Sequence, residues 1–245
     1  MNKRAQAVVM LLLGGALIRA TLSDLHLRYV KESLGPFLIA SGVLLVIAGA
    51  MTLLYELRPG HGAEAVPECA GDGDDDHGHH EPRVGWLLIL PVLGLLLVAP
   101  PALGAYSASQ TGSILNAANQ PSDFPPLPQG DPVEIGLADY ASRSVFDKGR
   151  TLAGRQIRMV GFLSANPDGT QYLTRMVLSC CAADGRPIKL GMAGDPPAGQ
   201  PDNGWVQVVG TYTDKVAEDP VNQAQIPFVQ VVSWEPIAPP KQPYE

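Results

Sequence analysis

Residues 174–184, Thr-Arg-Met-Val-Leu-Ser-Cys-Cys-Ala-Ala-Asp, carry the side chains in this chain that are best suited to chemistry. The run contains Cys180 and Cys181, two of the three cysteines, and Asp184. Thiolates and carboxylates are ligands of zinc and other divalent metals. Three cysteines make no disulfide framework, and a bridge between adjacent cysteines is strained. We interpret Cys180, Cys181 and Asp184 as a candidate metal or redox site. The alternative is a buried structural cysteine beside an incidental neighbour.

Nucleophilic catalysis is the least favoured use of these cysteines. The last histidine is His80, so no histidine follows Cys181 or lies anywhere in the second half of the chain. A Cys–His pair, the usual way to activate a thiol nucleophile, cannot form there. We therefore predict no catalytic residues and no enzymatic activity.

A second group of metal-binding side chain types lies in residues 55–83. Thiol, carboxylate and imidazole groups alternate there with glycines in Cys69, Asp74, Asp76, His77, His79 and His80. Their spacing is not that of a closed structural zinc site, which has paired cysteines or histidines at fixed intervals. The pattern predicts weak, exchangeable binding of Zn²⁺ or another divalent metal by a loop that is disordered without it. A solvated acidic linker with incidental histidines is the alternative.

Three apolar runs precede the polar half, at residues 5–21, 34–54 and 84–104. Each approaches the length that crosses about 30 Å of hydrocarbon, so residues 1–104 are predicted to contain three transmembrane helices. The first run could instead be a cleaved signal peptide, but Arg19 disrupts the small-residue pattern of a cleavage site. The prolines at 91, 100 and 101 predict a kink and an early end for the third helix.

The basic residues near the helix ends predict the orientation. Lys3, Arg4, Arg58 and Arg83 lie on one side, and no Lys or Arg follows the third run until Arg143. Under the positive-inside rule, the amino terminus and the loop 55–83 are cytoplasmic, and the carboxyl-terminal domain is extracytoplasmic. The protein is thus predicted to be a multi-pass protein of the cell membrane.

The polar half is predicted to be a small all-β domain at residues 132–245, joined to the membrane by a Pro-rich stalk at 105–131. A short amphipathic helix is expected within 135–147. Alternating or β-rich runs then predict five strands, at residues 156–163, 171–180, 187–193, 205–212 and 228–236. Five short strands of this kind favour an OB-like five-stranded Greek-key barrel, and a small sandwich is the alternative.

The position of the cysteines within the second strand predicts their exposure. Tyr172, Thr174 and Met176 share a face with Cys180 and look like the better core, so Cys180 is expected to be buried and Cys181 more exposed. In a regular strand the two thiols diverge. They converge only if the strand breaks near residues 179–180.

The charge excludes one frequent use of an OB-like barrel. The chain has a formal net charge of −7 and no basic stripe that could neutralise phosphates. Nucleic acid is therefore not an expected partner.

The architecture also resembles a known family. Arg28-Tyr29-Val30-Lys31 precedes the second helix, a Cys/His/Asp loop precedes the third, and the run Thr-Arg-x-x-x-Ser-Cys-Cys-Ala-Ala-Asp lies in a carboxyl-terminal β domain. This combination resembles the YcgQ-type bacterial membrane proteins over nearly the whole chain. The resemblance implies a partner, a multi-span permease-like membrane protein, and a context of zinc limitation. It supplies no mechanism.

Two functional hypotheses follow. In the first, the chain is an accessory subunit of a two-component membrane permease complex that is linked to zinc or other divalent metals. In the second, it is an envelope-anchored binding or scaffold module with no transport role. Small residues in the three apolar runs, among them Gly14, Gly42 and Gly94, favour close packing against other helices, so a membrane partner is expected in either case.

Overall fold

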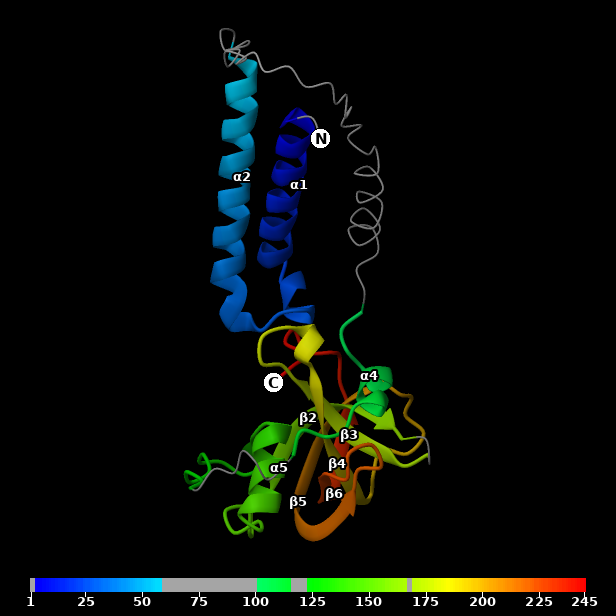
Figure 1. Cartoon of the computed structure of the whole chain (residues 1–245). Coiled ribbons are helices and arrows are strands. Elements are labelled where there is room, and N and C mark those ends of the chain that lie inside the picture. Colours follow the sequence, from blue (N-terminus) through cyan, green and yellow to red (C-terminus); the bar gives the residue numbers. More distant parts are fainter. Residues whose placement is uncertain (1–2, 59–100, 116–122, 167–168) are drawn as a thin grey trace, which may run out of the picture. The chain divides into compact units, whose positions relative to one another are not determined.

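The structure is a computed structural model of the chain, and it describes residues 3–58, 101–115, 123–166 and 169–245. These residues belong to two compact units. One contains the helices α1 (Lys3–Leu22) and α2 (Gly35–Leu57) (Figure 1). The other contains Ala102–Glu245 and also Leu27–Glu32. The connection between the two helices is therefore part of the β-strand unit.

Glycines allow α1 and α2 to pack closely side by side (Figure 1). A Cβ atom on Gly14 would lie 2.7 Å from the backbone oxygen of Gly42, and one on Gly49 would lie 3.0 Å from that of Ala7. Gly35, Gly42 and Gly49 are buried and recur at intervals of two helical turns, so they share one face of α2. Close backbone approach at small residues is typical of helices that associate within a membrane.

Among the described residues, one helical segment is long and apolar enough to cross a membrane, Glu32–Leu57. It matches the second predicted span, and a membrane anchor or a signal sequence would both have this character. The apolar part of α1, Gln6–Leu22, is shorter. The third predicted span, 84–104, lies outside the described residues except for 101–104, which are not helical.

Five strands of the second unit close into a barrel (Figure 1): β2 (Ile157–Ala165), β3 (Gln171–Val177), β4 (Arg186–Gly194), β5 (Trp205–Glu218) and β6 (Gln225–Pro236). Neighbours pair in the order β2-β3-β4-β6-β5, and β5 pairs back with β2. All of these pairs are antiparallel except β4–β6. The order β5-β2-β3-β4 is a Greek key. The closed five-stranded barrel predicted from the sequence is confirmed, and the sandwich alternative is wrong.

Two strand glycines lie where the backbones of neighbouring strands approach closely. A Cβ atom on Gly161 would lie 2.8 Å from the backbone oxygen of Thr174, and one on Gly210 would lie 2.6 Å from that of Gln230. Gly210 also lies at a register shift between β5 and β6. A larger residue at either position would push neighbouring strands apart, so glycine is favoured at these close approaches.

The main core fills the barrel and extends beneath α5 (Leu137–Phe146). This is the amphipathic helix predicted within 135–147, and its buried side chains include Leu137, Tyr140, Ala141 and Ser144. The short strand β1 (Val133–Glu134) runs parallel to β2 and immediately precedes α5 in the chain. The Tyr140 hydroxyl donates a hydrogen bond to the backbone oxygen of Phe228, which fixes the helix to β6.

The segment after residue 101 covers the outside of the barrel wall. Residues 105–110 form the helix α4 (Ala105–Gln110), whose Ala105 and Ala108 are buried against Phe162 and Met176. We predicted these residues as the start of a stalk, and that prediction is wrong for them. Their small side chains fit a second, smaller core, which a composition rich in Ser and Gln does not reveal.

The predicted inner face of β3 also needs correction. Leu173, which alternation places on the face opposite to Thr174 and Met176, lies in the main core. Met176 belongs to the smaller core beneath α4, and Thr174 is completely buried on the same side. Because α4 and its neighbours cover the outside of the wall, both faces of β3 are apolar or buried, and alternation could not identify the inner one.

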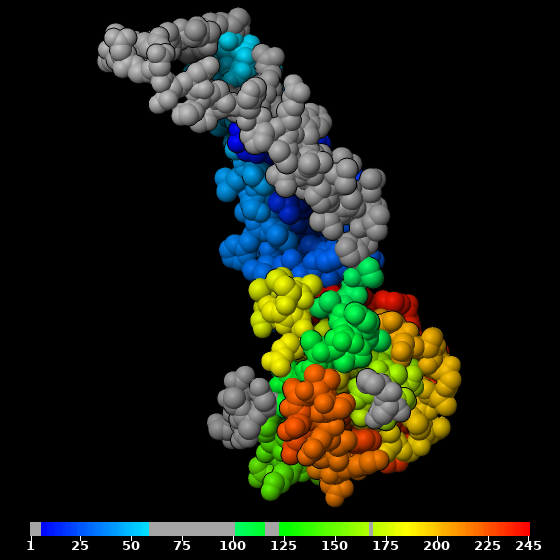
Figure 2. All heavy atoms as spheres, turned by 45° about the vertical axis from the view of Figure 1, so that its right-hand side comes forward, coloured from blue at the N-terminus to red at the C-terminus, as the bar shows by residue number. Residues whose placement is uncertain are grey.

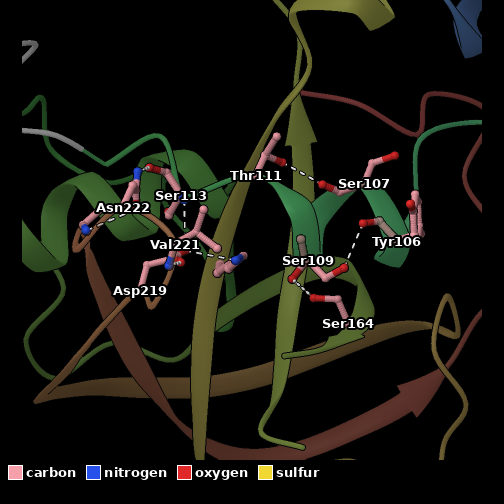
Figure 3. A network of polar contacts seen from close by, with 12 residues as sticks. Tyr106, Ser107, Ser109, Thr111, Ser113, Ser164, Asp219, Val221 and Asn222 are labelled. Carbon is pink, nitrogen blue, oxygen red and sulfur yellow. Dashed lines mark hydrogen bonds and ion pairs between the residues drawn. The ribbon is translucent and has the colours of Figure 1, made fainter. Parts of the chain in front are cut away.

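A buried polar network lies beside α4 on this wall (Figure 3). The Nζ atom of Lys189 lies 3.0 Å from Oδ2 of Asp219, and both side chains are fully buried. Asp219 also accepts hydrogen bonds from the backbone N–H groups of Ser113 and Val221. Asn222 donates to the backbone oxygen of Ser113. The network thus ties the segment after α4 to the β5–β6 connection.

Candidate functional site: a cysteine and carboxylate loop

The candidate site is the loop that follows β3. The strand ends at Val177, and residues 182–184 form the short 3₁₀ helix η5 (Ala182–Asp184). The backbone N–H of Leu178 donates to the backbone oxygen of Glu245, so strand pairing with β4 has stopped there. In the space-filling view, the segment around residue 180, drawn in yellow, lies at the surface (Figure 2). The strand break required for the two thiols to converge is therefore present.

Asp184 determines the shape of this loop. Its Oδ1 atom accepts a hydrogen bond from the backbone N–H of Ser179 at 2.9 Å. Its Oδ2 atom accepts from the backbone N–H groups of Cys180 at 2.8 Å and Cys181 at 3.3 Å. A carboxylate that takes three successive N–H groups replaces the ladder partners that a continuing strand would need. The aspartate therefore holds residues 179–181 in the loop that follows the end of the strand.

The Cys180 thiol is hydrogen-bonded to the same carboxylate, with its Sγ atom 2.9 Å from Oδ2 of Asp184. This hydrogen bond is the largest cause of two opposite shifts. Together with smaller contributions from the neighbouring backbone N–H groups and from Cys181, it lowers the pKa of Asp184 to about 2 and raises the pKa of Cys180 to about 11. At neutral pH the pair therefore consists of a carboxylate and a protonated thiol.

Cys181 is held differently. It is the residue before η5, and its side chain accepts a hydrogen bond from the backbone N–H of Asp184. Cys180 is exposed and Cys181 is half-buried. We predicted the reverse, that Cys180 is buried. The prediction extended the strand alternation to residue 180, whereas the strand ends at Val177 and alternation no longer applies.

The two sulfur atoms and one carboxylate oxygen of Asp184 all lie within 4.8 Å of one another. Around a tetrahedral zinc ion, bonds of about 2.0–2.3 Å would place such atoms roughly 3.3–3.8 Å apart. Small side-chain rotations are enough to close that difference. The three groups thus fit part of the coordination shell of a thiophilic ion. They leave at least one position for another ligand.

The segment Leu27–Glu32 contacts the cysteine loop directly. The backbone N–H of Lys31 donates to the oxygen of Cys180 at 3.0 Å, and the N–H of Ala182 donates to the oxygen of Tyr29 at 2.7 Å. Val30 and Cys181 are thereby paired in an antiparallel bridge. The sequence reading did not predict this contact, since backbone pairing leaves no signature in side chain types.

The chain segment 242–245 supports the loop from another side. Tyr244 forms a parallel bridge with Met176, and its hydroxyl donates to the backbone oxygen of Arg28 at 2.8 Å. The same hydroxyl accepts the backbone N–H of Leu103 at 2.8 Å. Gln242 donates a hydrogen bond to the carboxylate of Glu32. The segment Leu27–Glu32 is therefore fixed at both ends within this unit.

The second group of predicted ligands is not placed by the structure. Cys69, Asp74, Asp76, His77, His79 and His80 lie outside the described residues. The structure therefore brings together Cys180, Cys181 and Asp184, and it leaves the metal prediction for the loop 55–83 untested.

Comparison with protein-family models matches residues 140–245 to the DUF1980 C-terminal domain. The match includes all five barrel strands and the cysteine loop. A chain with this domain is consistent with the DUF1980 family, whose domain description states no function. Comparisons with curated proteins and with solved structures gave no significant match.

Proposed function

We propose that this protein is a membrane-anchored accessory subunit of a two-component permease complex, and that its barrel domain binds a thiophilic divalent metal ion, foremost zinc. The observation that carries the metal-binding part is the convergence of Cys180, Cys181 and Asp184 within 4.8 Å. Two thiolates and a carboxylate are a ligand set that zinc accepts. The exposure of Cys180 leaves the site open to exchange with a partner.

Metal binding at this loop requires the loss of protons. A thiol must be deprotonated before it can bind a metal ion, and the proton is released to solvent. The Cys180 thiol already donates a hydrogen bond to Asp184. A metal ion that replaces the thiol proton would therefore lie next to the Asp184 carboxylate, which is already in place. The arrangement is suited to reversible capture rather than to a closed structural site, which has four protein ligands.

The membrane role is supported by the helical unit. The segment Glu32–Leu57 can span a membrane, and α2 exposes large apolar side chains such as Phe37, Leu44 and Met51. Among the residues of α1 and α2 whose side chains the structure describes, no charged residue is buried in the way that lines a transport path, so we propose that a multi-span partner supplies the path. This requirement agrees with the permease partner implied by the resemblance to YcgQ-type proteins.

The proposed topology has one supporting contact. The connection Leu27–Glu32 belongs to the barrel unit. If α1 and α2 both cross the membrane, this connection and the barrel lie on the same side of it. The proposed topology has this property. The basic residues alone then carry the proposal that this side is extracytoplasmic and that the loop 55–83 is cytoplasmic. In this proposal the loop provides weak, exchangeable zinc binding on the opposite side.

The second candidate function, an envelope-anchored scaffold, is favoured by one specific observation. The Asp184 carboxylate already accepts three backbone N–H groups. A side chain with these bonds explains the turn without any metal. In the scaffold reading the cysteine loop is a structural turn, and its contacts with Leu27–Glu32 serve only to stabilise the domain.

Metal titration of the full chain in mild detergent tests the proposal. Addition of Cd²⁺, a spectroscopic substitute for zinc, should produce a thiolate-to-metal absorption band in the ultraviolet. The band should be lost in the double variant Cys180→Ser/Cys181→Ser and retained in Cys69→Ser. Absence of the band from the unmodified protein would overturn metal binding at this loop.

Affinity purification in mild detergent, followed by mass spectrometry, tests the partner. Recovery of a multi-span permease in stoichiometric amounts supports the accessory-subunit proposal. Recovery of only envelope proteins without membrane spans would favour the scaffold instead.

A further inference from the structure

The connection between α1 and α2 forms part of the cysteine loop's support. Its two backbone hydrogen bonds reach the oxygen of Cys180 and the N–H of Ala182. These atoms belong to the peptide groups on either side of Cys181. The connection therefore holds the backbone of the residue that lies at the centre of the ligand group.

This support keeps the loop in the conformation that brings the ligands together. Cys181 has extended backbone angles, φ −150° and ψ 170°, which suit an antiparallel bridge with Val30. In the same conformation its sulfur accepts the N–H of Asp184 and lies within 4.8 Å of the other two ligand atoms. Without the bridge, residues 180–182 would gain backbone freedom, which a bound metal ion would have to remove again.

From these contacts we infer that metal occupancy of the loop and docking of Leu27–Glu32 are positively coupled. This inference rests on the proposed metal-binding function and adds its regulation. Docking preorganises the site and so strengthens metal binding. By linkage, metal binding stabilises docking by the same factor.

The coupling gives the site a way to report its occupancy. Leu27–Glu32 is continuous in the chain with α1, which ends at Leu22, and with α2, which begins at Gly35. Metal binding at the barrel therefore restrains the ends of both helices through the short chain segments that join them. A partner that contacts the helices can then respond to the metal without touching the cysteines.

The test uses the full chain in detergent and two variants at one position. Lys31→Pro removes the N–H that donates to Cys180, and it suits an extended Val30 because the residue before proline prefers the β region. Lys31→Ala is the matched control, since it removes the charge but keeps the N–H. The affinity for Cd²⁺, measured by competition with a chelator, should fall about 5-fold or more in Lys31→Pro. It should be unchanged in Lys31→Ala.

Hydrogen–deuterium exchange of the unmodified protein provides a readout that does not depend on a variant's folding. The amides of residues 27–32 should exchange more slowly when Cd²⁺ is added. This protection should be absent in Cys180→Ser/Cys181→Ser. Normal Cd²⁺ binding with no change in exchange and equal affinities for the two Lys31 variants would overturn the coupling alone. Faster exchange of these amides in the presence of Cd²⁺ would show that the coupling is negative rather than positive. Absence of Cd²⁺ binding would overturn the proposed function itself.

Discussion

Lys189 and Asp219 form an ion pair that is completely enclosed in the wall of the barrel. Nζ and Oδ2 lie 3.0 Å apart and neither side chain is exposed. The contact is an ion pair rather than a well-aligned hydrogen bond, because Lys189 Nζ has no partner of hydrogen-bond geometry. The attraction of a buried pair is offset by the cost of removing both charges from water. Removing one of the two charged side chains is therefore more damaging to the stability of the domain than removing both.

Removal of one partner should strongly destabilise the domain. Lys189→Met leaves the Asp219 carboxylate buried and uncompensated, and we expect a loss of about 3–5 kcal/mol in the free energy of unfolding. The double variant Lys189→Met/Asp219→Leu should recover part of this loss. Urea unfolding in mild detergent, followed by tryptophan fluorescence, measures both. If Lys189→Met were as stable as the wild-type protein, the ion pair would have to be solvated.

Asp184→Asn should change the reactivity and the metal affinity of Cys180 in opposite directions. The carboxylate raises the pKa of the Cys180 thiol to about 11, and its removal should return that pKa towards about 8.5–9. At pH 8 the thiolate fraction would rise roughly 100-fold. Lower intrinsic nucleophilicity should reduce the gain in alkylation rate to roughly 10-fold.

The two effects are separated by two measurements on the same variant. Peptide-resolved alkylation with iodoacetamide reports the rate at Cys180, and Cd²⁺ titration reports the affinity, which should fall because one ligand is lost. In the unmodified protein the affinity should rise by about tenfold per pH unit for each proton released, since the Cys180 thiol is protonated across the neutral range. A pH-independent affinity would exclude Cys180 as a ligand.

Glu245 should stabilise α5 through its side chain. The carboxylate accepts the backbone N–H groups of Leu137 at 2.9 Å and Ala138 at 3.0 Å, at the positive end of the helix. Glu245→Ala should therefore lower the free energy of unfolding by about 1 kcal/mol. Glu134→Gln, at an exposed position near the same helix, is the control and should have little effect. Equal unfolding midpoints for the two variants would remove the capping role.

Adjacent glycines in α1 offer a matched pair for the helix contact. A side chain on Gly14 would meet the Gly42 backbone oxygen at 2.7 Å, whereas one on Gly15 would meet nothing within 4 Å. Gly14→Leu should separate α1 from α2 and increase the rate of proteolysis between them. Gly15→Leu should leave that rate unchanged. Identical proteolysis of the two variants would contradict the close packing.

Thiol labelling in intact cells tests the proposed orientation. A membrane-impermeant maleimide should label Cys180, which is exposed, because the barrel is proposed to be extracytoplasmic. Cys69 should be spared, because its loop is proposed to be cytoplasmic. Cells opened with detergent serve as the control in which both are accessible. Labelling of Cys69 alone in intact cells would reverse the orientation.

Local patterns in the sequence were sufficient for most of the barrel. The β-rich runs and the turn residues between them predicted all five strands, and the spacing of Leu137, Tyr140 and Ala141 predicted α5. These features depend on residues that are near one another in the chain, so they can be recognised without the fold. The three residues of the candidate site were recognised in the same way, from side chain types and spacing.

Predictions failed where burial comes from distant parts of the chain. The inner face of β3 was misassigned because α4 buries its outer face as well. The exposure of the two cysteines was reversed because the strand ends at Val177, before them, and Asp184 holds the residues that follow in a loop. Whether a polar stretch is a stalk or a covering helix depends on a surface such as Phe162 and Met176, which only the folded barrel provides.

The sequence by itself determined which side chains could bind a metal and that they lie next to a strand. Only the tertiary structure decided that they converge, and that the connection between α1 and α2 lies against them. The Val30–Cys181 bridge consists of backbone hydrogen bonds between segments that lie far apart in the chain. Every residue except proline carries the same backbone donor and acceptor. Residue types therefore do not reveal which distant segments pair through their backbones, and only the fold decides it.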